Sequence, residues 1–181
     1  PSGVGKTTLH DLVLKNPRFR GKIVRSISAT TRAPRGRERH GRDYFFLSKA
    51  MFCHKIRAGH FLEWARVFDN LYGTPLRNVR DLVRSGKSVL LCIDVQGAKR
   101  VQKTMKDAVT IFVRTADMDE LRRRLEARGT DPAKDIRLRL ETAAQELKEA
   151  KTYTYVIVND DLRRASAELE AILLNETKPS S

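Results

Sequence analysis

Apolar and polar residues alternate along this chain with two periods, one typical of strands and the other typical of helices. The run from Ser88 to Val95 is almost continuously apolar and has Asp94 near its end, a pattern typical of a central parallel strand buried on both faces. Gly59 and Gly86 stand where two helical patterns stop. The expected strands are 23–28, 43–48, 61–68, 88–95, 109–113 and 155–159, and the expected helices are 7–14, 49–58, 76–84, 96–103, 118–127, 131–150 and 162–174.

The order of these elements predicts an α/β fold, because strands that alternate with helices favour a parallel sheet flanked by helices. Between 28 and 87 the strands are shorter, follow one another closely and are joined by polar loops, which indicates a small mixed α/β insertion. We therefore expect a core formed by 1–27 and 88–181, with a helical lid at about 116–150 within it, and a separate subdomain at 28–87.

The first eight residues, Pro1 to Thr8, match the P-loop pattern G-x-x-x-x-G-K-[ST] except for its first glycine. In a P-loop, backbone N–H groups and the positive end of the following helix surround the phosphates of a nucleoside triphosphate. Lys6 would reach the β- and γ-phosphates, and the Thr7 hydroxyl would ligate Mg²⁺. The alternative is an ordinary turn before an amphipathic helix. The predicted phosphate-binding residues are Ser2, Gly3, Val4, Gly5, Lys6, Thr7 and Thr8.

A P-loop normally follows a buried strand, and no strand precedes Pro1. We expect the first strand of the sheet to be missing from this chain, which would weaken both the stability of the fold and the geometry of the loop.

The composition is that of a basic globular chain. Its 181 residues are 40% hydrophobic, which suits one domain with a small inserted subdomain. Lys and Arg number 36 against 22 Asp and Glu, so the formal net charge is +14. Such a charge attracts polyanions, and nucleic acid is one candidate. Basic residues are mixed with acids in segments such as 120–126, and a phosphorylated small substrate explains the clustered part equally well.

Two cysteines, Cys53 and Cys92, form no C-x-x-C pair, and this argues against both a disulfide framework and a zinc site. The cysteine usage fits a reducing cytoplasm. We see no apolar run of membrane-spanning length and no signal peptide.

A second candidate phosphate site lies in the loop 29–42, which is rich in Arg, Pro and Gly. Two guanidinium groups, Arg32 and Arg35, together with the phenol of Tyr44 could hold a dianionic phosphate at several oxygens. The alternative is a solvated basic loop, which is the usual role of a run of charged residues.

The order of the motifs resembles that of the guanylate kinases, and the resemblance covers essentially the whole chain. The blocks S-x-T-T-R-x-P-R and I-D-V-Q-G are specific, whereas the P-loop occurs in many families. The matching segments are 28–35, 41–44, 61–64, 72–74, 94–97, 128–130 and 158–161. The resemblance implies a P-loop kinase that transfers the γ-phosphoryl group of ATP to GMP, and to dGMP, with Mg²⁺.

The resemblance also assigns residues to the GMP site. Arg32, Arg35 and Tyr44 match positions that hold the GMP phosphate. One carboxylate, Glu63, can accept from guanine N1–H and N2–H₂, while the hydroxyl groups of Ser28 and Thr74 can donate to O6. Adenine would leave that carboxylate unpaired, which is costly. The implied GMP-binding residues are Ser28, Arg32, Arg35, Tyr44, Glu63, Tyr72, Thr74 and Asp94.

On the donor side, Arg128 and Arg139 match lid arginines that neutralise charge on the transferred group, so the implied catalytic residues are Lys6, Arg128 and Arg139. Asn159 matches a position that contacts the adenine of ATP. Closure of the lid and the GMP subdomain would exclude water.

Three features depart from the family pattern. Cys92 replaces the first acid of D-I-D-x-Q-G, so the electrostatics of the acceptor or metal site are in question unless Cys92 is simply a buried packing residue. Leu71 replaces the first tyrosine of Tyr-Tyr-Gly, and the first strand is absent.

Other functions remain open on the sequence alone. A guanylate-kinase-like binding module would keep the fold without catalysis, although such modules usually lose the P-loop lysine, which is present here as Lys6. A P-loop kinase for another phosphorylated ribose compound would not need Ser28, Glu63 and Thr74 together. Nucleic-acid binding is supported by net charge alone. The oligomeric state is not predicted.

Overall fold

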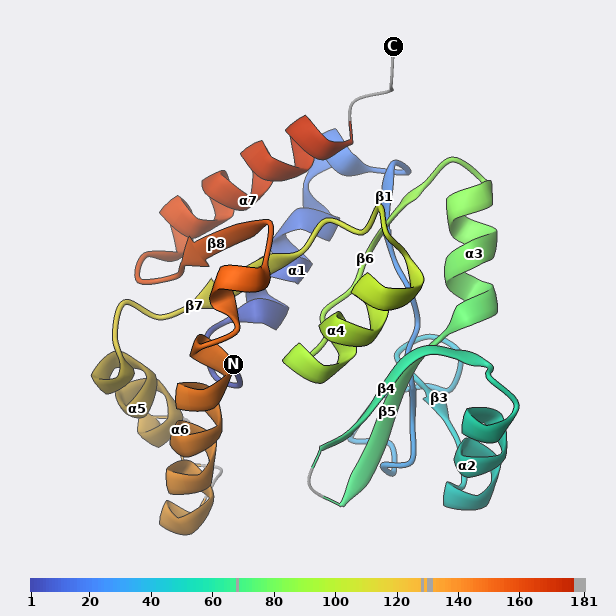
Figure 1. Ribbon diagram of the computed structural model, residues 1–181, viewed down its shortest axis with the longest axis horizontal. Coiled ribbons are helices and arrows are strands. Elements are labelled where there is room, and N and C mark those ends of the chain that lie inside the picture. Colours follow the sequence, from blue (N-terminus) through green and yellow to red (C-terminus); the bar gives the residue numbers. More distant parts are fainter. Residues whose placement is uncertain (68, 128, 130–131, 178–181) are drawn as a thin grey trace. The chain divides into compact units, whose positions relative to one another are not determined.

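The structure is a computed structural model that describes residues 1–67, 69–127, 129 and 132–177 (Figure 1). The chain divides into two compact units, one formed by Pro1–Asn16 with Val109–Ser181 and the other by Pro17–Ala108. Each unit is described by itself below.

The first unit has one pair of parallel strands, β7 and β8, in register from Ile111 opposite Tyr155 to Arg114 opposite Val158. Helix α7 packs against both β8 and α1, and α5 packs against α6 (Figure 1). The elements are α1 (Lys6–Lys15), β7 (Ile111–Arg114), α5 (Met118–Ala127), α6 (Ala133–Leu147), a 3₁₀ turn (Ala150–Thr152), β8 (Tyr155–Val158) and α7 (Leu162–Glu176).

The helices of this unit begin and end where their sequences provide capping groups. Asp161 accepts a 2.8 Å hydrogen bond from the backbone N–H of Arg164 and so caps the start of α7. Helix α1 ends at its C-terminus where the N–H of Asn16 donates to the carbonyls of Leu12 and Val13. Pro17 follows and cannot continue the helix. The buried residues of α7 recur at helical spacing, at Ala165, Leu169, Ile172 and Leu173.

The second unit contains two sheets. Strands β1 and β6 form a parallel pair, and a four-stranded sheet has the order β3-β2-β5-β4, in which β5 is antiparallel to both neighbours. The elements are a 3₁₀ turn (Pro17–Phe19), β1 (Ile23–Arg25), β2 (Ala29–Thr30), β3 (Phe45–Phe46), α2 (Lys49–Arg57), β4 (Phe61–Val67), β5 (Asn70–Pro75), α3 (Leu76–Arg84), β6 (Ser88–Leu90) and α4 (Val95–Thr104).

A small apolar core fixes α3 and α4 in this unit. Leu62 of β4, Val79 of α3 and Val101 of α4 are buried together, and the half-buried Val89 of β6 packs against them. Strand β5 passes under the stacked rings of Phe52 and Phe61, whose centroids are 4.5 Å apart. A Cβ on Gly73 would lie 3.0 Å from the Phe61 ring and 3.1 Å from the Phe52 ring, so glycine lets β5 pass close to both rings.

The predicted α/β class with parallel strands is confirmed, but three strand predictions were wrong in extent. The run 88–95 is a strand only to Leu90 and is half-buried, because Asp94 begins α4 instead of ending a buried strand. The predicted strand 23–28 stops at Arg25, and the predicted strand 43–48 is reduced to Phe45–Phe46. In addition, the sequence did not predict β5. Among the described residues, no helix is both long and apolar enough to cross a membrane.

Candidate active site

The P-loop motif forms a left-handed turn that leads directly into α1. Gly3 and Gly5 have φ angles of 90° and 91°, which favour glycine, and Gly5 is the residue that precedes the helix. No side chain of the described residues caps this helix, and its first turn contains no acid. The first N–H groups of α1 can therefore donate to an anion, which the positive end of the helix dipole also favours.

Two neighbouring elements hold the turn closely. A Cβ on Gly3 would lie 2.8 Å from Leu125 and 3.1 Å from Leu121, both on α5. Asn159, at the end of β8, is only 3% exposed and donates a 2.7 Å hydrogen bond from its side-chain amide to the carbonyl of Val4. A side chain on Gly5 would collide with that amide. The loop can therefore adopt this shape only with glycine at both positions.

Helix α6 contributes a cation to the same loop. Arg139 donates a 2.6 Å hydrogen bond from Nη1 to the hydroxyl of Ser2. Lys6 bonds to the carbonyl of Pro1, while Thr7 and Thr8 are exposed at the start of α1. The structure thus brings Ser2–Thr8, Arg139 and Asn159 together. The remaining predicted residue of this group, Arg128, lies outside the residues that the structure describes, as does Thr130.

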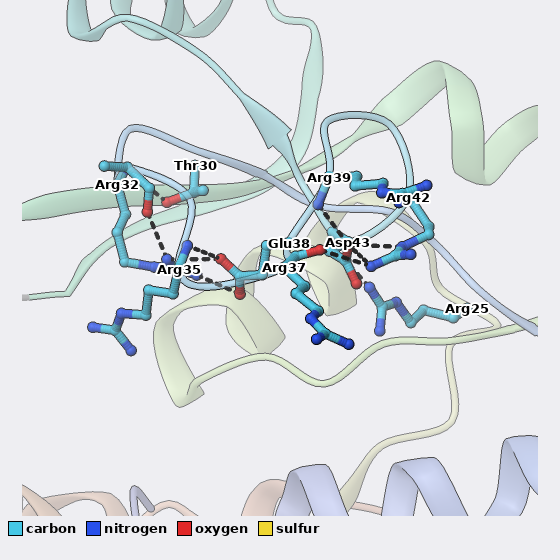
Figure 2. A network of polar contacts seen from close by, with 10 residues as sticks. Arg25, Thr30, Arg32, Arg35, Arg37, Glu38, Arg39, Arg42 and Asp43 are labelled. Atoms are coloured by element: carbon cyan, nitrogen blue, oxygen red, sulfur yellow. Dashed lines mark hydrogen bonds and ion pairs between the residues drawn. The ribbon is translucent and has the colours of Figure 1, made fainter.

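In the second unit, the arginine-rich loop is organised by two carboxylates (Figure 2). Glu38 accepts two 3.0 Å hydrogen bonds from Nη1 and Nη2 of Arg32, and a third of 2.7 Å from the backbone N–H of Arg35. Asp43 accepts from the N–H of Arg39 at 2.7 Å and from Nε of Arg42 at 2.9 Å. The hydrogen bond from Arg32 and that from the backbone of Arg35 hold the pKa of Glu38 below its ordinary value.

The aromatic residue predicted for the phosphate site, Tyr44, lies beside Arg32. The guanidinium carbon of Arg32 is 5.5 Å from the ring centroid of Tyr44, and Tyr44 meets Tyr72 edge-on with centroids 6.2 Å apart. Burial is the main cause that raises the pKa of Tyr44, so its phenol keeps its proton as a donor. Arg35 is exposed, and Figure 2 shows its guanidinium extending away from Glu38. The structure therefore places Arg32, Tyr44 and Tyr72 in one cluster, whereas the Arg35 side chain is exposed to solvent.

Glu63 and Thr74 form a buried pair across β4 and β5, where they stand directly opposite each other. The Thr74 hydroxyl donates a 2.5 Å hydrogen bond to Oε1 of Glu63. Burial raises the pKa of Glu63 above its ordinary value, the Thr74 hydrogen bond lowers it, and the nearby Asp94 raises it further. The predicted donation from Thr74 to guanine O6 would require its hydrogen to leave Glu63, and it stays a prediction.

Asp94 is next to this pair because it begins α4. Its Oδ1 accepts a 2.7 Å hydrogen bond from the N–H of Gly97, so the carboxylate caps the helix. A Cβ on Gly97 would lie 2.7 Å from Oε2 of Glu63, so any larger residue here would displace the carboxylate that α4 passes. Ser28 is half-buried between β1 and β2, and its carbonyl accepts a 2.8 Å hydrogen bond from Phe45.

Cys92 is exposed, so its interpretation as a buried packing residue is wrong. Among the described residues, no group of three or more His, Cys, Asp or Glu side chains is arranged to hold a metal.

Sequence reasoning missed one residue of the arginine-rich loop, Glu38. The signal was present, because Glu38 is the only acid between Arg32 and Arg42 in the sequence. Its bonds to both Arg32 and Arg35 could not be inferred from that spacing.

Comparisons with known proteins agree over nearly the whole chain. Residues 1–176 match the family model described as guanylate kinase. The chain is 46% identical over 173 residues to the guanylate kinase of Rubrobacter xylanophilus, which covers 96% of this chain and 89% of that protein. It is 46% identical over 178 residues to the guanylate kinase of Nitratidesulfovibrio vulgaris. That alignment covers 98% of this chain and 84% of the relative. A crystal structure of guanylate kinase from Anaplasma phagocytophilum aligns with a TM-score of 0.77 and 36% identity, covering 97% of this chain and 84% of that one.

Proposed function

The chain belongs to the guanylate kinase family, and we propose how its residues carry out that family's reaction, the transfer of a phosphoryl group from ATP to GMP. Family membership makes the protein an ATP:GMP phosphotransferase that forms GDP in purine nucleotide metabolism. The observation that best supports the roles below is the buried Glu63 carboxylate, held by Thr74 and approached closely by Gly97 of α4.

The first unit binds the donor. The uncapped start of α1 and the left-handed glycines offer backbone N–H groups to the phosphates of ATP, and Lys6 contacts the β- and γ-phosphates. Arg139, which already bonds to Ser2, neutralises charge that develops on the transferred group. Asn159 fixes the loop through Val4 and borders the adenine. Arg128 stays a prediction as a second lid arginine.

Kinases that use ATP generally need a divalent metal, and we assign Mg²⁺ here. The loop residues fit this ion, because the exposed Thr7 hydroxyl stands at the start of α1 beside the free N–H groups that would surround the phosphates. Thr7 would hold the ion, which would supply positive charge to offset that of the phosphates.

The second unit binds the acceptor phosphate. Arg32 and Arg35 hold the dianion, and the phenols of Tyr44 and Tyr72 donate to it. Glu38 orients Arg32: its carboxylate binds the end of the guanidinium, which leaves the Nε side of the fork for a phosphate oxygen.

Glu63 reads the base. Its carboxylate accepts from N1–H and N2–H₂ of guanine, a side-by-side pair of donors that adenine, cytosine and uracil lack. Ser28 and Asp94 complete the site. We propose dGMP as a second acceptor beside GMP.

We keep the division into a core of 1–27 and 88–181, with a lid at about 116–150, and a GMP subdomain at 28–87. We also place the enzyme in the cytoplasm, where its substrates occur and its thiols stay reduced.

The test is ADP production from ATP and Mg²⁺ with GMP, AMP, CMP or UMP offered separately. Turnover with GMP and dGMP only is expected. Lys6→Ala is the matched control, and it should abolish turnover while leaving GMP binding by calorimetry within about twofold, since Lys6 contacts only the donor. A folded protein that binds GMP but turns over no acceptor would favour a binding module instead.

A further inference from the structure

Arg100 is a charged residue of α4 that stacks on an aromatic ring of β4. Its guanidinium carbon is 4.3 Å from the ring centroid of Trp64, a cation–π contact that favours this position of the side chain. Arg100 follows Gly97 by three residues, so both lie on the same face of α4. That face packs against β4, the strand that carries Glu63 (Figure 1). The stacking therefore holds a cation one helical turn from the point where α4 touches the Glu63 carboxylate.

Packing alone does not account for this arginine. Its Nη1 atom is buried and has no hydrogen-bond partner among the described residues. A buried N–H group of a charged side chain without an acceptor is costly, and a residue such as Met could cover Trp64 without that cost. An arginine with this buried N–H group is explained if a positive charge is needed beside Trp64.

The group that needs a cation is Glu63. It is 4% exposed, and the groups that face it are the Thr74 hydroxyl from β5 and, from α4, the Asp94 carboxylate and the Arg100 guanidinium. Burial and Asp94 raise the pKa of Glu63, whereas Thr74 and Arg100 lower it. Arg100 is the one cation in this set. When guanine fills the site, more water leaves and the need for a counter-charge grows.

We propose that Arg100 is a specificity-determining positioning residue: held flat on Trp64, it supplies the positive charge that keeps Glu63 ionised and able to accept both guanine donors. The inference rests on the proposed guanine-reading role of Glu63. A protonated carboxyl group would present one donor and a weaker acceptor to two N–H donors, so loss of the ionised form weakens GMP binding in particular.

The experiment compares four variants by steady-state kinetics between pH 5 and 9. Arg100→Met keeps an apolar cover for Trp64 but removes the charge, and Arg100→Lys keeps the charge. Lys103→Met is the matched control, because it removes a positive charge from an exposed position of the same helix. Glu63→Gln tests the guanine-reading role separately. Thermal unfolding of each variant confirms that it folds.

Arg100→Met should raise the KM for GMP about tenfold or more at pH 7, because it removes the positive charge near a buried carboxylate, with kcat and the KM for ATP little changed. It should also move the acidic limb of kcat/KM for GMP to higher pH. Arg100→Lys should recover most of both effects, and Lys103→Met should match the unmodified protein.

Two results would overturn the proposal. One is an Arg100→Met profile that coincides with that of Lys103→Met. The other is a raised KM that Lys does not rescue and that leaves the acidic limb in place, which would assign Arg100 to packing on Trp64. If Glu63→Gln leaves discrimination between GMP and AMP unchanged, the proposed role of Glu63 fails, whatever Arg100 does.

Discussion

The hydroxyl of Thr74 is hydrogen-bonded to Oε1 of Glu63 at 2.5 Å, and the two residues face each other across the β4–β5 ladder. Thr74 is 0% exposed and Glu63 is 4% exposed. A carboxylate buried this deeply is costly unless donors surround it. The hydrogen bond from β5 therefore both satisfies Glu63 and sets the direction in which its oxygens face.

Replacing Thr74 with Val should weaken GMP binding and destabilise the fold. The change keeps the shape of the side chain but leaves Oε1 of Glu63 without its donor, at a cost of about 1–3 kcal/mol in the free energy of unfolding. The KM for GMP should rise about tenfold or more, because Glu63 can then rotate. Thr74→Ser is the control and should retain most of both properties. Denaturant unfolding and GMP kinetics measure them, and a Val variant equal to the Ser variant would contradict this role.

Glu63→Gln should be more stable than the unmodified protein at pH 8 and nearly inactive with GMP. Burial raises the pKa of Glu63 above its ordinary value of 4.5, so the native state holds this proton more tightly than the unfolded chain does. Ionisation therefore opposes folding above the raised pKa, and the penalty disappears as the pH falls below 4.5. The difference in Tm between the two proteins should shrink from pH 8 toward pH 4. A difference that is constant with pH would show that ionisation of Glu63 is not its cause.

Glu38→Gln should raise the KM for GMP with little change in kcat. The carboxylate holds both terminal nitrogens of Arg32 and the backbone of Arg35, and a neutral amide offers one acceptor in place of the two (Figure 2). An increase of about tenfold is expected from the loss of a bidentate, charge-assisted contact that orients a phosphate ligand. Asp81→Asn removes an exposed carboxylate elsewhere in the same unit and serves as the control. Equal KM values for the two variants would refute the orienting role.

Asn159→Ala should impair the donor site and spare the acceptor site. The Asn159 amide is buried and donates to the Val4 carbonyl inside the P-loop, so its removal leaves that carbonyl unsatisfied and the loop less fixed. We expect a loss of about 1–3 kcal/mol in stability and a KM for ATP raised about tenfold, with the affinity for GMP unchanged. Calorimetric titration with each nucleotide separates the two sites. A loss of GMP affinity of the same size would contradict this assignment.

The helices could be predicted from the sequence because their signals are local. Asp161 and Ser48 cap α7 and α2 with their own side chains, and apolar residues recur at helical spacing between the caps. Strand β5 could not be predicted in this way. Its sequence, Asn70–Pro75, is rich in residues that favour turns, and it is a strand because β4 and β2 pair with it on either side.

The candidate site also has features that the sequence could predict and others that it could not. The motifs predicted Glu63, Thr74 and Asp94 for one site. They could not predict that the Thr74 hydroxyl donates to Glu63 or that Asp94 caps α4. The bonds of Glu38 to Arg32 and Arg35 and the stacking of Arg100 on Trp64 depend on how the loop and the helix fold onto their neighbours. Such contacts follow from three-dimensional packing, which periodicity and composition do not encode.

The net charge of the chain is confined to the unit that holds the proposed GMP site. Residues 17–108 contain 21 Lys and Arg and 7 Asp and Glu, which accounts for the whole formal charge of +14, while the rest of the chain contains 15 of each sign. A field of this kind attracts a dianionic substrate and is screened by salt, with a Debye length of about 10 Å at 0.1 M. We therefore expect kcat/KM for GMP to fall several-fold between about 50 and 200 mM salt, and more steeply than kcat/KM for ATP.

Two exposed arginines of the loop, Arg37 and Arg39, test whether this field serves the substrate. Replacing both with Gln should lower kcat/KM for GMP at low salt and flatten its dependence on ionic strength, since less attraction remains to be screened. Arg163→Gln changes an exposed arginine of the neutral unit and should leave the slope as it is. If the double variant keeps the original slope while the unmodified protein retains single-stranded or duplex nucleic acid in a salt-sensitive way, the charge serves a polyanion and not GMP.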